Sequence, residues 1–353
     1  MWGLLAVLCL TGCTQSASVE PAATVELSEI AIPLDSPRED ASYILVEHGV
    51  DETVKAAAEA FAQDLERQTG GAYLVRETEY ILRDLSDEGV HFAFLDGEDY
   101  RTWCDAFRPL SRPFLYTGYN HFTMSVNSEK VMSYVRAEMR TKGAVPVAAF
   151  YLGSDVLVSD VNLYDYTSFA GAIIDGDDAP IPETIPTLLM NGDSYTRWYA
   201  YDKAGSFVQV ELDAAARAQA LQTGEAEIAE FAAGDLALLE LESTEGLNLY
   251  RTVQHVHTVW LTANPAFYES LSGKPLAAVQ EAIAGIYPRI DYVVLEQEGD
   301  VLDHVWREPD SGDLTKTRQA LYRSAASLEP ALSREETEAV TYIREIGSAM
   351  KEG

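Results

Sequence analysis

The spacing of apolar and polar residues predicts strands and helices that alternate along most of the chain. Apolar residues at helical spacing run from Val54 to Leu65, with Asp51 before them as an N-cap and two glycines after them as a stop. By the same criteria we expect helices at 51–69, 128–141, 213–222, from Asn264 onward and over most of 314–353, and strands at 43–46, 72–75, 91–95, 145–150, 156–159, 227–231 and 256–262. Strands that alternate with helices indicate an α/β architecture.

The first residues resemble a bacterial lipoprotein signal. An apolar run too short to span a bilayer ends in Leu-Thr-Gly-Cys at 10–13 and gives way to polar residues. We therefore expect 1–13 to be a signal with its lipobox, Cys13 to carry the lipid (diacylglycerol and palmitate), and 14–41 to form a flexible tether outside the cytoplasm, in the periplasm or at the cell surface. Because the run has no Lys or Arg before it, an ordinary cleaved signal and a chance apolar start stay as alternatives.

The acidic composition narrows the classes of partner. Asp and Glu number 57 against 25 Lys and Arg, which gives a formal net charge of -32. A nucleic-acid partner would need a basic face and is excluded, and anionic lipids would repel the chain, so a covalent lipid would have to anchor it. Cys9 would leave with the signal and Cys13 would be lipidated, so Cys104 would be a free thiol without a disulfide partner.

Candidate catalytic and metal-binding motifs are weak. The Gly-Asp-Ser at 192–194 resembles that of some esterases but has no histidine at a suggestive spacing. The acidic run at 175–178 lacks the ligand spacing and terminal Glu of a calcium loop, which favours a solvated turn. His255 and His257 would lie on one face of a strand, as metal ligands can, but with no third ligand near in sequence, packing or hydrogen bonding is favoured. We therefore expect no enzyme, no cofactor and no bound metal.

Five short segments stand in an order that carries more information than any one of them. They are His48 with Glu-Arg-Gln-Thr-Gly-Gly at 66–71, Leu-Ser-Arg-Pro-Phe-Leu-Tyr at 110–116, Phe-Ala-Gly at 169–171, Ala-Leu-Gln-Thr-Gly-Glu-Ala-Glu at 220–227, and His257 followed by Asn264, Phe267 and Leu271. The series resembles the TRAP-type (DctP-like) extracytoplasmic solute-binding proteins over about residues 44–290. The resemblance implies a two-lobed α/β periplasmic-binding-protein fold (type II-like) with a cleft between the lobes. It also implies capture of a small polar solute for the membrane subunits of a TRAP-type permease.

In such a fold the chain passes between the lobes more than once. The resemblance places lobe one at 42–152 with 252–290, and lobe two at 153–251 with 291–353. Closure on the solute needs ligand contacts to both lobes and no covalent chemistry. Two alternatives stay open: a surface lipoprotein of this fold that acts as a sensor or interaction module without transport, and, more remotely, an exported hydrolase.

The positions that hold the solute in this family depart from its pattern here. Two arginines that bind a substrate carboxylate correspond to Asp155 and Asp175, and a polar Asn corresponds to Phe231. Three interpretations follow: the pocket binds a cationic or neutral polar solute, the carboxylate clamp is absent and the protein serves another purpose, or the correspondence is shifted by a few residues. With His48, which follows the first strand, and His257, these residues are the expected ligand contacts.

Overall fold

The computed structural model describes residues 42–48, 52–79, 90–96, 103–163, 186–190, 208–239, 246–302, 315–316, 318–319, 322 and 331–352. Several sequence predictions lie outside these residues. They concern Cys13 and its signal, the tether, the segments 169–171 and 192–194, and Asp175 with the acidic run around it.

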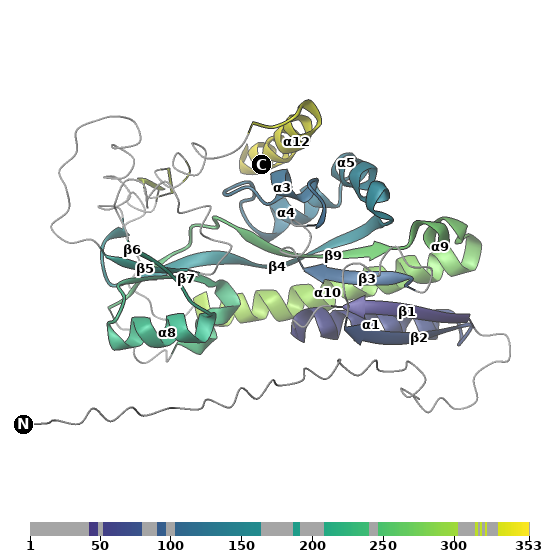
Figure 1. Cartoon of the computed structure of the whole chain (residues 1–353), viewed down its shortest axis with the longest axis horizontal. Coiled ribbons are helices and arrows are strands. Elements are labelled where there is room, and N and C mark those ends of the chain that lie inside the picture. Colours follow the sequence, from purple (N-terminus) through teal and green to yellow (C-terminus); the bar gives the residue numbers. More distant parts are fainter. Residues whose placement is uncertain are drawn as a thin grey trace, which may run out of the picture. The chain divides into compact units, whose positions relative to one another are not determined.

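The described strands form one nine-stranded sheet (Figure 1). They are β1 (Ser42–His48), β2 (Tyr73–Glu79), β3 (Phe92–Asp96), β4 (Val145–Ser159), β5 (Thr187–Met190), β6 (Val208–Glu211), β7 (Ile228–Ala232), β8 (Asn248–Tyr250) and β9 (Val256–Ala263). The strand order is β2-β1-β3-β9-β4-β7-β5-β6, and β8 pairs with β4. β2 and β3 pair in parallel with β1, and β6 and β7 pair in parallel with β5. The antiparallel pair β4 and β9 therefore links two sets of parallel strands.

β4 continues through a stretch where the sequence pattern predicts a break. The sequence pattern predicts two separate strands, at 145–150 and 156–159, because polar residues interrupt the apolar run between them. In the structure the register shifts between Tyr151 and Ser154, and Gly153 has a φ of 105°. A β-bulge at this glycine accommodates the extra residues, so the strand continues. The prediction of two strands is therefore wrong. The first half of β4 pairs with β9, and the second half pairs with β7 and β8.

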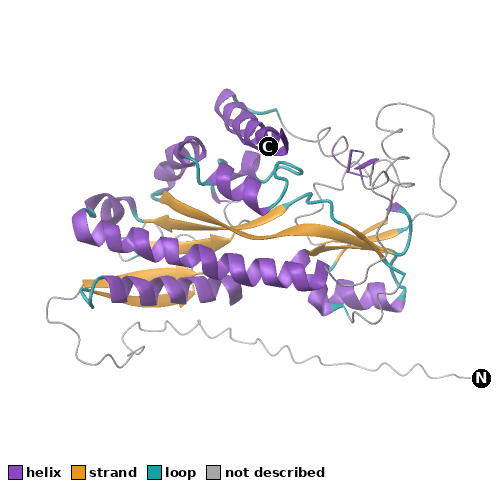
Figure 2. Cartoon of the chain, turned by 180° about the vertical axis from the view of Figure 1, so that it is seen from behind, coloured by secondary structure: helices purple, strands orange, loops and turns teal. Residues whose placement is uncertain are grey.

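Helices pack along the sheet. They are α1 (Glu52–Gln68), α3 (Phe107–Leu110), α4 (Tyr119–Val126), α5 (Glu129–Met139), α8 (Ala214–Thr223), α9 (Pro265–Ser270), α10 (Gly273–Leu302) and α12 (Arg334–Glu352), with the 3₁₀ turns η3 (Arg140–Lys142) and η5 (Ala233–Leu238). The predicted cap Asn264 is confirmed, because its side chain accepts a hydrogen bond from the Phe267 N–H. The long helix α10 lies along the sheet (Figure 2) and contacts α1, β4 and η5. Among the described helices, none combines the length and the hydrophobicity that crossing a bilayer requires.

Within the described residues, the buried apolar side chains form one large core and two smaller ones. The large core draws on residues 44–151 and 256–294 and includes Val340 and Ile343 of α12. The smaller cores draw on residues 156–250. The change from one core to the others therefore falls at the bulge of β4, and α12 belongs with the large core, where it packs against α3, α4 and α5.

Candidate functional site

A buried glutamate of α10 reaches the bulge of β4. Glu298 Oε1 accepts a hydrogen bond from the Ser154 N–H at 2.9 Å and another from the Tyr151 hydroxyl at 3.2 Å. A Cβ on Gly153 would lie 3.1 Å from the same oxygen, so the glycine lets the carboxylate approach the strand. Burial raises the pKa of the Glu298 carboxyl, and the hydrogen bonds from Ser154 and Tyr151 oppose that shift. The bulge is thus fastened to α10 through one carboxylate.

Asp155, the next residue along β4, lies close to two histidines, one near the start of β9 and one directly before β9. Its Oδ1 lies 2.6 Å from His257 Nε2, and its Oδ2 lies 3.7 Å from His255 Nδ1. The Asp155 N–H donates to the His255 carbonyl oxygen at 3.0 Å, which fixes the two segments against each other. The two imidazole rings are 5.0 Å apart between centroids. The hydrogen-bonding role that the sequence favours for this pair is present at His257.

A buried arginine and a second carboxylate lie on the β7 side of the site. Arg217 of α8 is 3% exposed, and its guanidinium carbon lies 5.5 Å from the centre of the Phe231 ring. Burial lowers the pKa of Arg217, whereas the carboxylates of Glu230 and Asp155 act in the opposite direction. Glu230 is itself buried and accepts a hydrogen bond from the Gln254 amide. Charged groups on β4, β7 and α8 therefore interact electrostatically in the interior.

The structure brings together two of the residues expected to bind ligand, Asp155 and His257. Phe231 is fully buried in one of the smaller cores. Its register partner is the residue after Asp155, so the side chains of Phe231 and Asp155 lie on opposite faces of the sheet. His48 is buried at the end of β1. One strand, β3, lies between His48 and β9, and the position on β9 that is level with His48 is four residues from His257. His48 and His257 are therefore about 16 Å apart.

Sequence reasoning missed Arg217, Glu230 and Glu298. A signal for Arg217 was present, because it falls three residues after Ala214 and four before Leu221, on the stripe that α8 buries. A cation on an apolar stripe indicates an interior partner. Glu298 gives no such signal, since it is one of several acidic residues near the end of α10.

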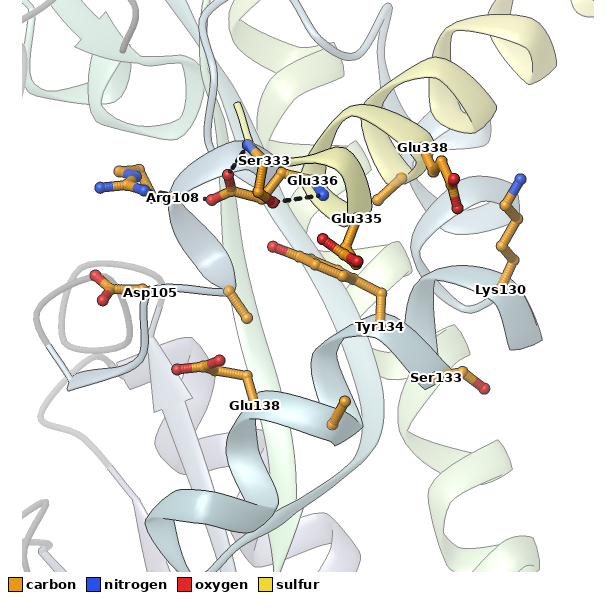
Figure 3. Close-up of a pocket in the computed structure, with 13 residues that line it drawn as sticks. Asp105, Arg108, Lys130, Ser133, Tyr134, Glu138, Ser333, Glu335, Glu336 and Glu338 are labelled. Atoms are coloured by element: carbon orange, nitrogen blue, oxygen red, sulfur yellow. Dashed lines mark hydrogen bonds and ion pairs between the residues drawn. The ribbon is translucent and has the colours of Figure 1, made fainter. Parts of the chain in front are cut away.

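A pocket of about 680 Å³ lies between α3, α5 and the start of α12 (Figure 3). Its charged lining consists of Asp105, Glu138, Glu335, Glu336, Glu338, Arg108 and Lys130. Glu336 pairs with Arg108 at 3.3 Å and accepts a hydrogen bond from the Ser333 N–H at 2.6 Å, which caps α12. These contacts attach α12 to α3, and none of the described residues expected to bind ligand lines this pocket.

Solved structures of TRAP periplasmic solute-binding proteins share the fold. One from Ochrobactrum anthropi, with its C-terminus bound in the ligand-binding pocket, has a TM-score of 0.67 at 14% identity, over 88% of this chain and 97% of that one. The apo form of TeaA, the ectoine-binding protein of the TeaABC TRAP transporter, has a TM-score of 0.67 at 14% identity, over 87% and 99% of the two chains. DctP7, an extracytoplasmic solute receptor of Bordetella pertussis that binds pyroglutamic acid, has a TM-score of 0.62 at 11% identity, over 86% and 100%.

No protein-family model matches the sequence, and no curated protein matches it either. At identities this low, similarity between structures shows the fold alone. It confirms the predicted fold class: the chain has the two-lobed α/β fold of TRAP periplasmic solute-binding proteins.

Proposed function

We propose that the chain is an extracytoplasmic solute-binding protein that captures a small polar solute and delivers it to a TRAP-type permease. The observation that carries the proposal is the cluster of buried Asp155, buried Glu298 and partly exposed His257, which lies where the large core meets the smaller ones. A solute bound at such a junction contacts both lobes, and only a ligand that does so favours the closed form. Capture of this kind is non-covalent. Likeness in fold to proteins named for solute binding supports the same function.

We place the boundary between the lobes near residue 152. The change of core at the bulge of β4 supports the division at residue 152 between 42–152 with 252–290, and 153–251 with 291–353, whereas Val294 still belongs to the large core. For the last helix we depart from that division. Because α12 packs against α3, α4 and α5, we assign residues 331–352 to lobe one.

The proposed solute is cationic or neutral and polar. Asp155 supplies acceptor oxygens, with Asp175 as its proposed counterpart, and Glu298 adds a second buried carboxylate close by. A solute carboxylate about 4 Å from Asp155 would be repelled by about 4 kcal/mol at an effective dielectric constant of 20. His48 and Phe231 are the remaining proposed contacts. Both are buried and would have to become accessible in the open form.

We further propose that a lipid on Cys13 holds the protein at the outer side of a membrane. The tether at 14–41 would give a random-coil reach of roughly 30 Å, enough for the lobes to open and close beside a permease. Cys13→Ser should move the protein from the membrane fraction to the soluble fraction, whereas Cys9→Ser, within the same signal, should leave it in place. Retention of the Cys13→Ser variant at the membrane would contradict the anchor.

Thermal denaturation of the full chain against a panel of acids, amines, sugars and nucleosides tests solute capture. A specific ligand at about one hundred times its dissociation constant should stabilise the folded state by about 2.7 kcal/mol. The panel is run with EDTA, so that contaminating metal ions play no part. Stabilisation by simple carboxylates alone would refute the role given to Asp155 and Asp175.

A second candidate function is a sensor or interaction module that keeps the fold without transport. Two observations favour it: Phe231 is fully buried, and Asp155 already has His257 as an internal partner. If no small molecule in the panel shifts the melting transition, this candidate replaces transport. Genes for the membrane subunits of a TRAP-type permease next to the gene for this chain would favour transport instead.

A further inference from the structure

We propose that Asp155, His255 and His257 form a binding site for a divalent transition-metal ion of the zinc class. The site lies within the region proposed above to bind the solute, and its biological role depends on that proposal. The binding itself is tested without any solute.

The three side chains already stand at distances close to those of a metal site. One ligand atom from each residue lies within 4.8 Å of the other two. In a tetrahedral zinc site with bonds of about 2.05 Å, neighbouring ligand atoms are about 3.4 Å apart. Asp155 Oδ1 lies 2.6 Å from His257 Nε2 and Asp155 Oδ2 lies 3.7 Å from His255 Nδ1, and these two distances fall on either side of that value. We therefore expect rotations of the three side chains to bring one Asp155 oxygen and the two histidine nitrogens to tetrahedral spacing.

The backbone beneath the site is held in place. Asp155 belongs to β4, and its N–H bonds to the carbonyl oxygen of His255, while the preceding Ser154 pairs with Val256 of β9. His255 and His257 are two residues apart, so an extended backbone directs both rings to the same side. Ligands held on two adjacent strands, or directly beside one as His255 is, lose little conformational freedom when an ion binds, and this makes a site more effective.

The chemistry of the ligands selects the kind of ion. Two imidazoles and one carboxylate suit zinc and similar ions, whereas calcium and magnesium prefer oxygen ligands throughout. Three protein ligands leave a fourth position for water or another group. Glu298 of α10 lies close enough to His257 for the two groups to interact electrostatically. Asp155 is 1% exposed, but the His257 side chain is 22% exposed and gives the ion a route from solvent.

The test is a titration of the EDTA-stripped full chain with Zn²⁺ in competition with a chromogenic chelator. We expect one tight site per chain, not displaced by excess Mg²⁺ or Ca²⁺. Changes in second-shell partners alone weaken metal sites by about 10–100-fold, so loss of a ligand should weaken this one by at least about a hundredfold. That loss is expected for Asp155→Asn, His255→Gln and His257→Gln. The matched control is His91→Gln, a histidine that bonds to the Leu45 N–H and is not a member of the three-residue group.

Absence of tight Zn²⁺ binding, or binding that the three substitutions leave unchanged, would overturn the proposal and leave a hydrogen-bonded group only. If Asp155→Asn fails to fold by circular dichroism, His257→Gln decides, because its side chain is the most accessible of the three. The metal site and solute capture can fail separately. Zn²⁺ binding with no response in the solute panel removes capture alone, and a solute response in EDTA with no Zn²⁺ binding removes the metal site alone.

Discussion

Substitution of Gly153 by alanine tests how α10 is fastened to the bulge of β4. The backbone at Gly153 has a φ of 105°, which a residue with a Cβ adopts only under strain. The new Cβ would also lie 3.1 Å from Glu298 Oε1, the atom that accepts hydrogen bonds from Ser154 and Tyr151. Alanine therefore imposes backbone strain and displaces a buried carboxylate at the same time.

The two effects can be separated in size. Strain at a positive φ costs about 1–2 kcal/mol. Disturbing a hydrogen bond to a charged group costs about 1.5–3 kcal/mol more. Gly246 is the matched control, since its φ is 96° and a Cβ there would meet no atom within 4 Å. Gly246→Ala should therefore show the strain alone, and Gly153→Ala should be the more destabilising variant by about 1.5–3 kcal/mol.

Urea denaturation followed by circular dichroism measures both variants, with and without Glu298→Ala. In the Glu298→Ala background the excess destabilisation at Gly153 should disappear, because the displaced carboxylate is no longer there. Equal losses of stability for Gly153→Ala and Gly246→Ala in the wild-type background would refute the reasoning. An excess that persists without Glu298 would attribute the effect to another neighbour.

Three further predictions concern the core, a buried acid and the described thiol. Phe61→Ala should lower the free energy of unfolding by about 3–5 kcal/mol in urea, because its ring is fully buried against those of Phe92 and Phe94; a loss under 1 kcal/mol would contradict this packing. Because the pKa of Glu298 is raised in the folded state, its stabilising contribution is complete below the unfolded pKa of 4.5 and is lost as pH rises through the folded pKa. The stability of Glu298→Gln relative to wild type should therefore increase as pH rises above 4.5. A difference in stability that does not change with pH would refute this. Burial raises the pKa of Cys104 to about 11, so mass spectrometry should find its peptide unlabelled by maleimide at about pH 8 until urea is added.

Local features of the structure were predictable from local sequence. Asn264 caps α9 because a short polar side chain and a following proline suit the first turn of a helix. The apolar stripe from Val54 to Leu65 forms the buried face of α1 for a similarly local reason. The order of five weak motifs then led to the fold class.

Features that depend on which strands are neighbours were not predictable. Asp155 lies 102 residues before His257, and nothing in that interval indicates that β4 and β9 are adjacent. Without the strand order, the two histidines had no third partner, and a metal site was not expected. The bulge was missed because a polar interruption in an apolar run normally ends a strand, whereas here Gly153 and Glu298 together allow it to continue.

The most direct test of the central claim is calorimetric titration of the full chain, in EDTA, with the solute that most raises its melting temperature. We predict one solute per chain and a loss of affinity of about tenfold or more in Asp155→Asn, equivalent to about 1.4 kcal/mol. The variant Asp160→Asn changes an exposed aspartate directly after the same strand and should bind as the wild type does. Equal affinity of Asp155→Asn and wild type would contradict solute capture at the junction of the lobes.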